Sequence, residues 1–318
     1  MNRRKFIKTG LCSASTAGLY SMLSCDERIS EMEGLTKRKL GKTGEELSMI
    51  GFGGVIVMNE TAVEAANRVA QAIDLGVNYF DVAPTYDNAE EMMGPALEPY
   101  RKRCFLACKT TQRSGKDART ELEASLNKLR TDHVDLYQLH ALTTDEDVET
   151  AFGSNGAMQT FIKAKDEGKI RYIGFSAHSE TAALKAMDLY HFDSILFPIN
   201  YVCWFQGKFG PTVISKAQEQ GLGILALKAF ARSAIPEGAP QPYEKCWYIP
   251  EEDPEIQNLA MRFTISQGVT AAIPPGEWKF FQKAVDTART FSPLTEDEMN
   301  QLQSASDGLN PIFKTSSV

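Results

Sequence analysis

Residues 78–103, NYFDVAPTYDNAEEMMGPALEPYRKR, combine a short apolar run with an amphipathic segment that follows it closely. The run at 78–83 is typical of a buried strand, and the segment after it has helical spacing. A strand that leads directly into a helix is the building unit of a parallel sheet covered by helices. The fold therefore depends on how often this unit recurs.

The strand-then-helix unit recurs along the whole body of the chain. Its apolar runs lie at residues 47–54, 78–83, 104–110, 134–140, 172–178, 194–200, 223–230 and 269–276. Eight units fit a closed (β/α)8 TIM barrel, which typically needs about 250 residues, better than an open doubly wound sheet. An open sheet usually has G-x-G-x-x-G after its first strand, and GFGGVIVMN lacks the third glycine at that spacing. We expect one barrel domain over residues 37–318.

Three segments lie outside this rhythm. Residues 37–48, KRKLGKTGEELS, predict a small β-hairpin ahead of the barrel. Residues 295–306, TEDEMNQLQSAS, predict an extra C-terminal helix, with Thr295 as N-cap and Glu298 three residues later. Residues 231–253 are long for a loop and rich in proline, glycine and aromatic residues, which indicates a functional or a disordered segment.

The first 25 residues have the composition of a targeting segment. Residues 3–8, RRKFIK, resemble the twin-arginine export signal R-R-x-F-x-K, and a weakly apolar stretch of small residues follows them. We expect an export signal peptide over 1–25, recognised by the export machinery, then a polar tether over 26–36. Cys25 ends a stretch similar to a lipoprotein cleavage box, so a lipid anchor is the alternative to a free protein. The expected location is the periplasm or cell envelope.

Composition excludes several classes of function. The net charge of -7 and the pI near 5.3 argue against nucleic acid as a partner. The chain has six cysteines without a C-x-x-C pair and four scattered histidines, so no metal site is expected. Cys104 and Cys108 lie four residues apart in one strand, about 13 Å, which is too far for a disulfide. We interpret both as small buried hydrophobes.

Polar residues stand at the ends of successive apolar runs. Asp81, Lys109 and His140 end the second, third and fourth runs, and Tyr86 follows Asp81 by five residues. The fifth, sixth and seventh runs carry Ser176, Asn200 and Lys228. In barrels of this kind the chemistry lies at the C-terminal ends of the strands. Polar groups at the same end of three successive strands therefore predict an active site there.

These residues resemble the aldo-keto reductases, and the likeness extends from Lys37 to about Asp307. The stretch from Asp81 to Tyr86 matches the D-x-x-x-x-Y motif of that family, and Lys109 and His140 match its catalytic lysine and histidine. The resemblance implies NAD(P)H-dependent reduction of an aldehyde or ketone to an alcohol, or the reverse.

The resemblance also implies a role for each catalytic residue. Tyr86 acts as general acid and base, and the ammonium of Lys109 lowers the pKa of the Tyr86 hydroxyl towards the operating pH. Asp81 holds Lys109 as an ion pair. His140 donates a hydrogen bond to the substrate oxygen, where negative charge grows.

The same resemblance assigns residues to the nucleotide. Ser176 matches a residue that holds the nicotinamide carboxamide, although Ala177 stands where the family usually has Asn. Asn200 matches the family's amide residue at the end of the sixth strand. Lys228 is expected at the pyrophosphate, and Gly276 opens the last barrel helix, where phosphate binds well. NADP is the cofactor that the resemblance implies. Residues 273–285, IPPGEWKFFQKAV, contain no arginine, and Phe281 lies near the position expected for one. NAD is therefore the alternative.

Two further interpretations stay open beside the enzyme. One is an exported barrel protein that binds nucleotide as a sensor or carrier without significant turnover. The other is a metal-dependent barrel hydrolase, which needs clusters of carboxylates or histidines that the sequence does not offer. The residue pattern identifies neither the carbonyl or alcohol substrate nor the oligomeric state.

Overall fold

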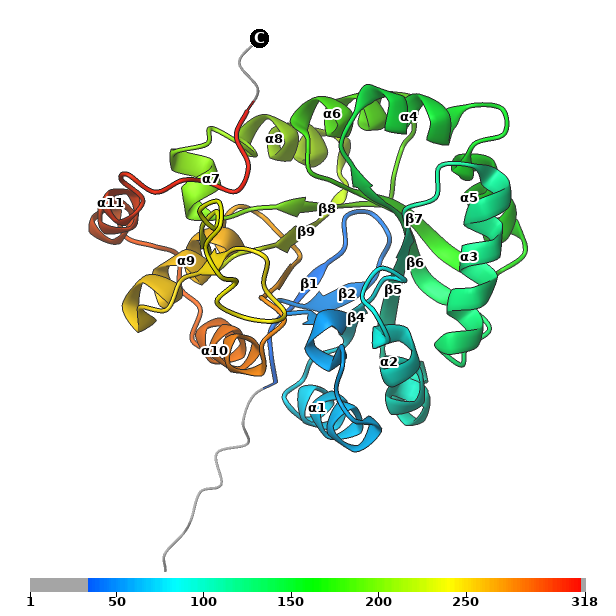
Figure 1. Ribbon diagram of the computed structural model, residues 1–318, viewed down its shortest axis with the longest axis horizontal. Helices are drawn as coiled ribbons and strands as arrows, with labels where there is room; N and C mark the ends of the chain where they lie inside the picture. Colours follow the sequence, from blue (N-terminus) through cyan, green and yellow to red (C-terminus); the bar gives the residue numbers. More distant parts are fainter. Residues whose placement is uncertain (1–33, 316–318) are drawn as a thin grey trace, which may run out of the picture. The chain divides into compact units, whose positions relative to one another are not determined.

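The computed structural model of the protein describes residues 34–315. Its main sheet has eight strands in the order β12-β9-β8-β7-β6-β5-β4-β3, and each neighbouring pair is parallel. The two ends of the sheet meet, because Gly51 N donates to Ala272 O at 3.0 Å and Ala272 N donates to Met49 O at 2.8 Å. Helices surround this closed sheet (Figure 1). The predicted (β/α)8 barrel is confirmed.

Every barrel strand is followed by a covering helix. The strands are β3 (Phe52–Gly53), β4 (Tyr79–Asp81), β5 (Phe105–Thr110), β6 (Val134–Leu142), β7 (Ile170–Ala177), β8 (Ser194–Pro198), β9 (Gly223–Leu227) and β12 (Ala271–Ile273). The main helices are α1 (Ala62–Asp74), α2 (Ala89–Leu97), α3 (Gly115–Lys128), α5 (Ala157–Asp166), α6 (Glu180–Leu189), α8 (Pro211–Gln220), α9 (Pro254–Ser266) and α10 (Trp278–Arg289). Two 3-10 segments are η1 (Gly54–Val57) and η2 (Glu98–Arg103). The sequence did not predict α4 (Asp145–Phe152) or α7 (Tyr201–Phe205).

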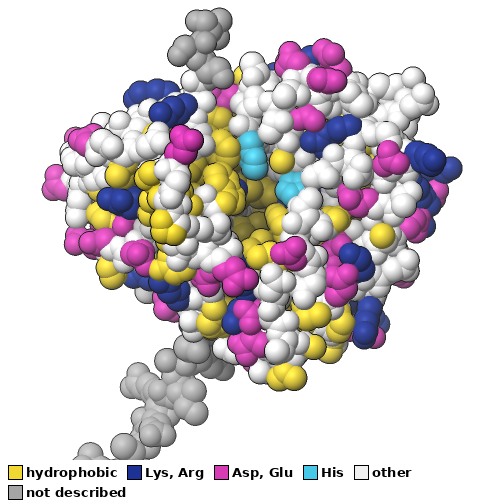
Figure 2. Space-filling view, viewed as in Figure 1, with side chains coloured by type: hydrophobic (Ala, Val, Ile, Leu, Met, Phe, Trp, Pro, Cys, Tyr) yellow, Lys and Arg dark blue, Asp and Glu magenta, His cyan; other side chains and the backbone are white. Residues whose placement is uncertain are grey.

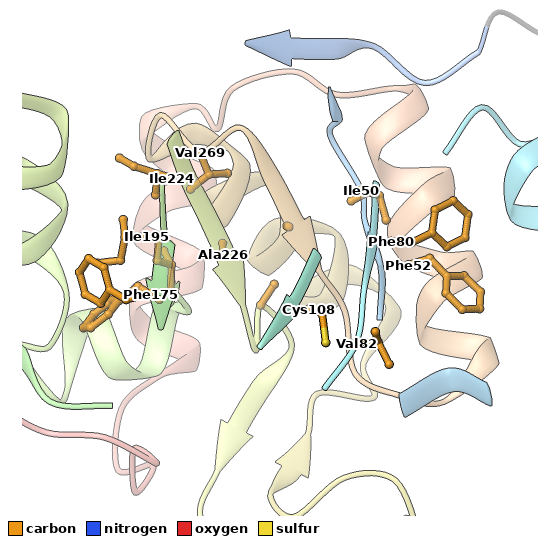
Figure 3. Close-up of a cluster of buried hydrophobic side chains, with 14 of the residues drawn as sticks. Ile50, Phe52, Phe80, Val82, Cys108, Phe175, Ile195, Ile224, Ala226 and Val269 are labelled. Atoms are coloured by element: carbon orange, nitrogen blue, oxygen red, sulfur yellow. The ribbon is translucent and has the colours of Figure 1, made fainter. Parts of the chain in front are cut away.

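Side chains along the strands alternate between the barrel interior and the helix layer. On β4, Tyr79 belongs to the interior cluster and Phe80 to the cluster beneath the helices. Figure 3 shows Phe80 beside Phe52, with both rings pointing away from their strands towards a helix. Burial of one such ring contributes about 1.5–3 kcal/mol relative to exposure. The period of two also turns Asp81 inward, on the side of Tyr79.

The N-terminal hairpin closes the bottom of the barrel. β1 (Lys37–Lys39) pairs antiparallel with β2 (Glu46–Ser48), as predicted. Leu40 and Leu47 are fully buried and belong to the barrel-interior cluster. The predicted first strand, 47–54, is wrong as one element: its first residues complete the hairpin, and only Phe52–Gly53 pair with β4. One apolar run serves two sheets because the chain changes partners near Ile50, which bridges to Ala272.

The long segment after β9 is ordered. β10 (Ala231–Ser233) and β11 (Ile249–Pro250) pair antiparallel at its two ends. We call residues 234–248 between them the strap, seen as the yellow loops in Figure 1. Cys246 and Tyr248 of the strap are buried and pack with Ala231. The predicted C-terminal helix is also present as α11 (Glu296–Ala305), with a reciprocal capping box between Thr295 and Glu298.

Three further sequence predictions concern the cysteines, membrane attachment and the N-terminal segment. Cys104, Cys108, Cys203 and Cys246 are free and buried, which confirms the interpretation of the first two. Across residues 34–315, no helix is both long enough and apolar enough to span a bilayer. The expected export signal, the tether up to Glu33 and the anchor residue Cys25 lie outside the described residues.

Candidate active site

A cavity of about 360 Å³ opens at the C-terminal ends of the barrel strands. Figure 2 shows it as a hollow lined by apolar side chains, with histidine side chains at its edge. The lining comprises Gly53, Val55, Met58, Asp81, Thr85, Tyr86, Lys109, His140, Ser176, His178, Leu196, Leu227, Lys228, Gln241, Glu244, Lys245, Cys246, Trp247, Tyr248, Ile273, Pro274, Pro275 and Gly276. The structure thus brings together seven of the eight predicted site residues. Asn200 is not part of this lining.

Strand register places Lys109 beside Asp81. Asp81 is the register partner of Ala107, and Lys109 lies two residues further on the same face of β5. The Lys109 ammonium donates hydrogen bonds to Asp81 Oδ1 and, at 3.2 Å, to the Val82 carbonyl. The Tyr79 hydroxyl donates to Asp81 Oδ2 at 3.3 Å. Both oxygens of a buried carboxylate are therefore paired, and the lysine is held at the floor of the pocket.

Burial and pairing act in opposite directions on this ion pair. Burial raises the pKa of the Asp81 carboxyl, while the Lys109 ammonium and the Tyr79 hydroxyl oppose that rise. Burial alone would lower the pKa of Lys109, but the charge of Asp81 and the neighbouring Tyr86 outweigh it, and the pKa of Lys109 is raised. Lys109 therefore stays protonated at neutral pH.

Tyr86 reaches over this lysine from the loop after β4. Its ring centroid is 5.4 Å from Lys109 Nζ and 5.9 Å from the His140 ring, which lies nearly perpendicular to it. The next residue, Asp87, has φ of 42°, a conformation that asparagine and aspartate tolerate better than most residues. Asn59 Nδ2 donates to Asp87 Oδ2 at 3.4 Å, so the loop is tied to the loop after β3.

The pKa of Tyr86 departs from the sequence expectation. Burial raises it, and the Lys109 ammonium lowers it by a smaller amount, so that the pKa of the Tyr86 hydroxyl is raised overall. The sequence predicted a net lowering of the Tyr86 pKa, and this prediction is wrong. The packing around Tyr86 excludes more water from its hydroxyl than sequence spacing could indicate. Tyr86 is therefore protonated across the neutral range, as a proton donor must be.

A bulge in β6 sets the position of His140. The register of β6 shifts between Leu139 and Leu142, and Ala141 has φ of 53°. Ala141 N donates to Ser176 Oγ at 2.8 Å, which joins the bulge to β7. Burial, with Lys109 as the next cause, lowers the pKa of His140 to about 2. The neutral imidazole has one N–H to donate to a substrate oxygen.

Arg113 supports His140 from outside the pocket. Its Nη2 donates to the His140 carbonyl at 2.8 Å, and its Nε pairs with Asp147 Oδ1 at 3.1 Å. Asp147 also forms the capping box of α4 with Thr144. The helix that sequence reasoning missed therefore anchors the arginine that holds the His140 backbone. His140 and Asp147 lie 27 and 34 residues after Arg113, and no sequence pattern connects the three positions.

Ser176 and Asn200, both predicted to bind the cofactor, have different environments. Ser176 lines the pocket, and its Oγ already accepts the hydrogen bond from Ala141 N, which leaves its hydroxyl proton to donate. Asn200 caps α7, because its Oδ1 accepts from Cys203 N at 2.9 Å. Its Nδ2 is buried without a hydrogen-bond partner among the described residues. Ser176 thus faces the cavity, whereas Asn200 is committed to a helix terminus.

The strap is fastened across the pocket to η1. Lys245 Nζ donates to the Ile56 carbonyl at 2.9 Å and to Glu60 Oε1 at 2.6 Å, and its side chain is only 7% exposed. Gly276 lies beside this fastening: a Cβ added there would come within 2.5 Å of Val55 Cγ1. Glycine at 276 therefore allows the β12–α10 turn and the strap to approach one another closely.

Aromatic residues of the strap form part of the pocket wall. Trp247 and Tyr248 line the cavity, and Trp247 is 51% exposed. Three other aromatic residues lie elsewhere: Trp204 and Phe205 pack on Phe263, and Tyr243 packs on Phe280. Of these five aromatic residues, Trp247 and Tyr248 alone line the pocket.

Residues 273–285, at the end of β12 and the start of α10, contain no arginine. Phe281 is fully buried against Phe52 and Trp278, with ring centroids 5.4 Å and 5.0 Å away. Glu277 is the N-cap residue of α10, and its carboxylate accepts from Lys245 N at 3.3 Å. Within residues 34–315, no cluster of three or more His, Cys, Asp or Glu side chains is arranged to hold a metal ion.

Comparison with known proteins points to one family. The model of the aldo/keto reductase family matches residues 49–307. Relatives include the uncharacterized oxidoreductase YqkF of Bacillus subtilis, 32% identical over 45% of this chain and 49% of its own length. L-galactose dehydrogenase of Arabidopsis thaliana is 31% identical over 44% of this chain and 47% of its own length. The chain spans about half the length of these curated relatives.

Solved structures of the same family share the fold. The holo form of aldo-keto reductase AKR11C1 from Bacillus halodurans has a TM-score of 0.68 at 23% identity and covers 87% of this chain and 98% of its own. An aldo-keto reductase from Bombyx mori, solved in complex with NADP, has a TM-score of 0.63 at 20% identity, over 86% of this chain and 93% of its own. At such identity the likeness concerns the barrel alone.

Proposed function

This chain belongs to the aldo/keto reductase family of oxidoreductases, and we propose that it reduces an aldehyde or ketone to an alcohol, or catalyses the reverse reaction. The observation that carries the proposal is the convergence of Asp81, Tyr86, Lys109 and His140 on one cavity. A binding protein has no need of a buried lysine–aspartate pair beneath a tyrosine hydroxyl. General acid catalysis needs that arrangement.

Each residue of this set has a defined role in the proposed reaction. A bound nicotinamide dinucleotide supplies the hydride that reaches the carbonyl carbon. Tyr86 gives its hydroxyl proton to the carbonyl oxygen, and Lys109 stabilises the phenolate that Tyr86 becomes. Asp81 holds Lys109 in place through its carboxylate. His140, neutral, donates a hydrogen bond to the same substrate oxygen and fixes its position.

The cofactor we propose is NADP by family likeness, with NAD as the alternative. Ser176 would donate to the nicotinamide carboxamide, and the backbone at Gly276 would lie against phosphate near the start of α10. The buried ring of Phe281 and the carboxylate of Glu277 favour the nucleotide without a 2′-phosphate. Mass spectrometry of the nucleotide that copurifies with the folded protein distinguishes the two.

The test of the proposed activity is direct. Purified protein is mixed with NADPH or NADH and a panel of aldehydes and ketones, and nucleotide absorbance at 340 nm is followed (the reduced nicotinamide band). We expect carbonyl-dependent oxidation of one nucleotide. Tight nucleotide binding without turnover on any carbonyl, in either direction, would instead support the sensor or carrier interpretation.

We also propose that the protein is exported after it folds, on the basis of RRKFIK at residues 3–8. The strap, fastened by Lys245, would retain nucleotide loaded in the cytoplasm, where free nucleotide is plentiful. Replacement of Arg3 and Arg4 by lysine should then keep folded protein in the cytoplasm, as cell fractionation would show. Export of the Lys–Lys variant as efficient as that of the parent would contradict this route, and empty exported protein would contradict pre-loading.

A further inference from the structure

Lys228 is a pocket lysine without a carboxylate partner. It lines the cavity and is half-buried, and burial lowers its pKa to about 8. Its Nζ forms no ion pair within residues 34–315; its contact is with the Trp247 ring, whose centroid is 5.2 Å away. The other two lysines of the lining differ, since Lys109 pairs with Asp81 and Lys245 with Glu60. The pocket wall therefore holds one uncompensated amine.

The backbone at Lys228 gives no structural reason for this side chain. Its φ is 66°, in the left-handed region that glycine and asparagine adopt more readily than lysine. The turn is closed by the hydrogen bond from Ala231 N to the Lys228 carbonyl at 2.9 Å, which any residue could form. A strained backbone and a partly desolvated charge both oppose folding, so neither explains a lysine at this position.

Lys228 lines the same cavity as Tyr86, Lys109 and His140, although it follows β9 and they lie at or after the ends of β4 to β6. Its charge helps to lower the pKa values of His140 and His178. The charge of Lys109 in turn helps to lower the pKa of Lys228. The fastening of the strap involves a different lysine, Lys245, next to Gly276. The amine is thus placed to meet a ligand that occupies the cavity shared with the catalytic residues.

We propose that Lys228 binds an anionic group of the carbonyl substrate, so that the preferred substrates are aldehydes or ketones that carry a carboxylate. This assignment rests on the proposed reductase function and replaces the pyrophosphate contact expected from sequence. Trp247 and His178 would flank the organic part of the substrate; the His178 ring packs at a tilt against Phe313, with 4.9 Å between ring centroids. The substrate carboxylate would accept a charge-assisted hydrogen bond from the Lys228 ammonium, which has no carboxylate partner among the described residues of the protein.

The experiment compares acids with their own methyl esters. The pairs are 4-formylbenzoate with methyl 4-formylbenzoate, and an aliphatic ω-oxo acid with its ester; kcat/KM is measured for each. The parent protein should prefer the acid by about 10- to 100-fold, the usual range for a hydrogen bond to a charged group. Lys228→Met should abolish the preference, chiefly through a lower kcat/KM for the acid, and Lys228→Arg should restore most of it.

The matched control is Lys208→Met. Lys208 also has a positive φ, 52°, but is exposed and lies outside the pocket lining. Lys208→Met removes the same charge from the protein without a change in the cavity, so the acid preference should persist. Thermal melting of all three variants shows that each is folded before its kinetics are compared.

Two results would overturn the assignment. One is a parent protein that reduces acid and ester equally well. The other is a Lys228→Met variant that keeps the acid preference and loses affinity for the nucleotide. That result would support the contact between Lys228 and the pyrophosphate that was expected from sequence. If no carbonyl is reduced at all, the proposed function fails; calorimetric titration of 4-(hydroxymethyl)benzoate into parent and Lys228→Met then tests the anion site alone. Equal binding to both would exclude the site, and binding to the parent alone would support it.

Discussion

On the β4–β6 side of the pocket, Asp81, Lys109 and His140 stand at the ends of adjacent strands, and Asp81 and Lys109 form an ion pair. On the β9–β12 side, the strap supplies half of the lining residues. Asp81 and Lys109 are almost inaccessible to solvent, and strand register fixes their distance. Lys228 and Trp247 are partly exposed and come from a turn and a loop. The comparison separates a catalytic side from a binding side.

The two sides should therefore tolerate substitutions and insertions differently. A strand end in a closed sheet cannot move without breaking ladder hydrogen bonds, so a catalytic side built there keeps its geometry. A loop can change length and residue type while the barrel stays intact. Substitutions on the catalytic side should therefore affect the chemical step, and those on the binding side should affect affinity and substrate preference.

The largest effect should follow from Tyr86→Phe. The change removes only the hydroxyl, so kcat for carbonyl reduction should fall by about 10²–10⁴-fold, the range for a positioned general acid. Nucleotide affinity, measured by fluorescence titration, should stay the same, because the phenyl ring remains. The matched control is Tyr190→Phe, whose ring packs on Phe192 outside the pocket. Near-parental turnover of Tyr86→Phe with a good aldehyde would rule out Tyr86 as proton donor.

Lys109→Met should have the next largest effect. Turnover should fall about 100-fold, and Asp81→Asn should give a milder loss. Reduction requires protonated Tyr86, so its rate is lost as pH rises through the Tyr86 pKa. Lys109 lowers that pKa, so its removal should move the alkaline limb to still higher pH. A pH–rate profile of Lys109→Met superimposable on that of the parent protein would contradict this role.

On the binding side, Lys245→Met should release the strap. Nucleotide dissociation, followed by stopped-flow fluorescence, should quicken about tenfold, with kcat for the chemical step little changed. Pairing with Lys245 and Arg68 lowers the pKa of Glu60 against the effect of its burial. The fastening of the strap should therefore persist at pH 4.5, the ordinary value for glutamate, and be lost only as pH falls through the lower pKa of Glu60. Lys185→Met, which breaks an exposed ion pair on α6, should not alter dissociation.

The smallest expected effect is the pH response of His140. With a pKa of about 2, the imidazole stays neutral wherever the protein is folded and active. The kcat for reduction should accordingly vary less than about twofold between about pH 5 and 8, where an unperturbed histidine titrates. An acid limb near pH 6.5 that disappears in His140→Asn would show that His140 titrates in the working range.

From the sequence alone, the repeat of strand and helix determined the barrel, and the polar strand ends determined which residues meet at its mouth. Both are local patterns: alternation along a strand decides which side chains turn inward, and parallel strands bring their C-terminal ends together. Asp81, Lys109 and His140 could be predicted for this reason. Sequence also indicated the hairpin and the capped helix α11, whose signals lie within a few residues.

Only the tertiary structure decided the features that depend on distant parts of the chain. The division of residues 47–54 between hairpin and barrel depends on Ala272, and the hold on His140 depends on Arg113 and a helix that begins at Asp145. The raised pKa of Tyr86 depends on how many elements exclude water from the cavity. Desolvation and long-range hydrogen bonds are properties of the packed chain as a whole, so no residue spacing encodes them.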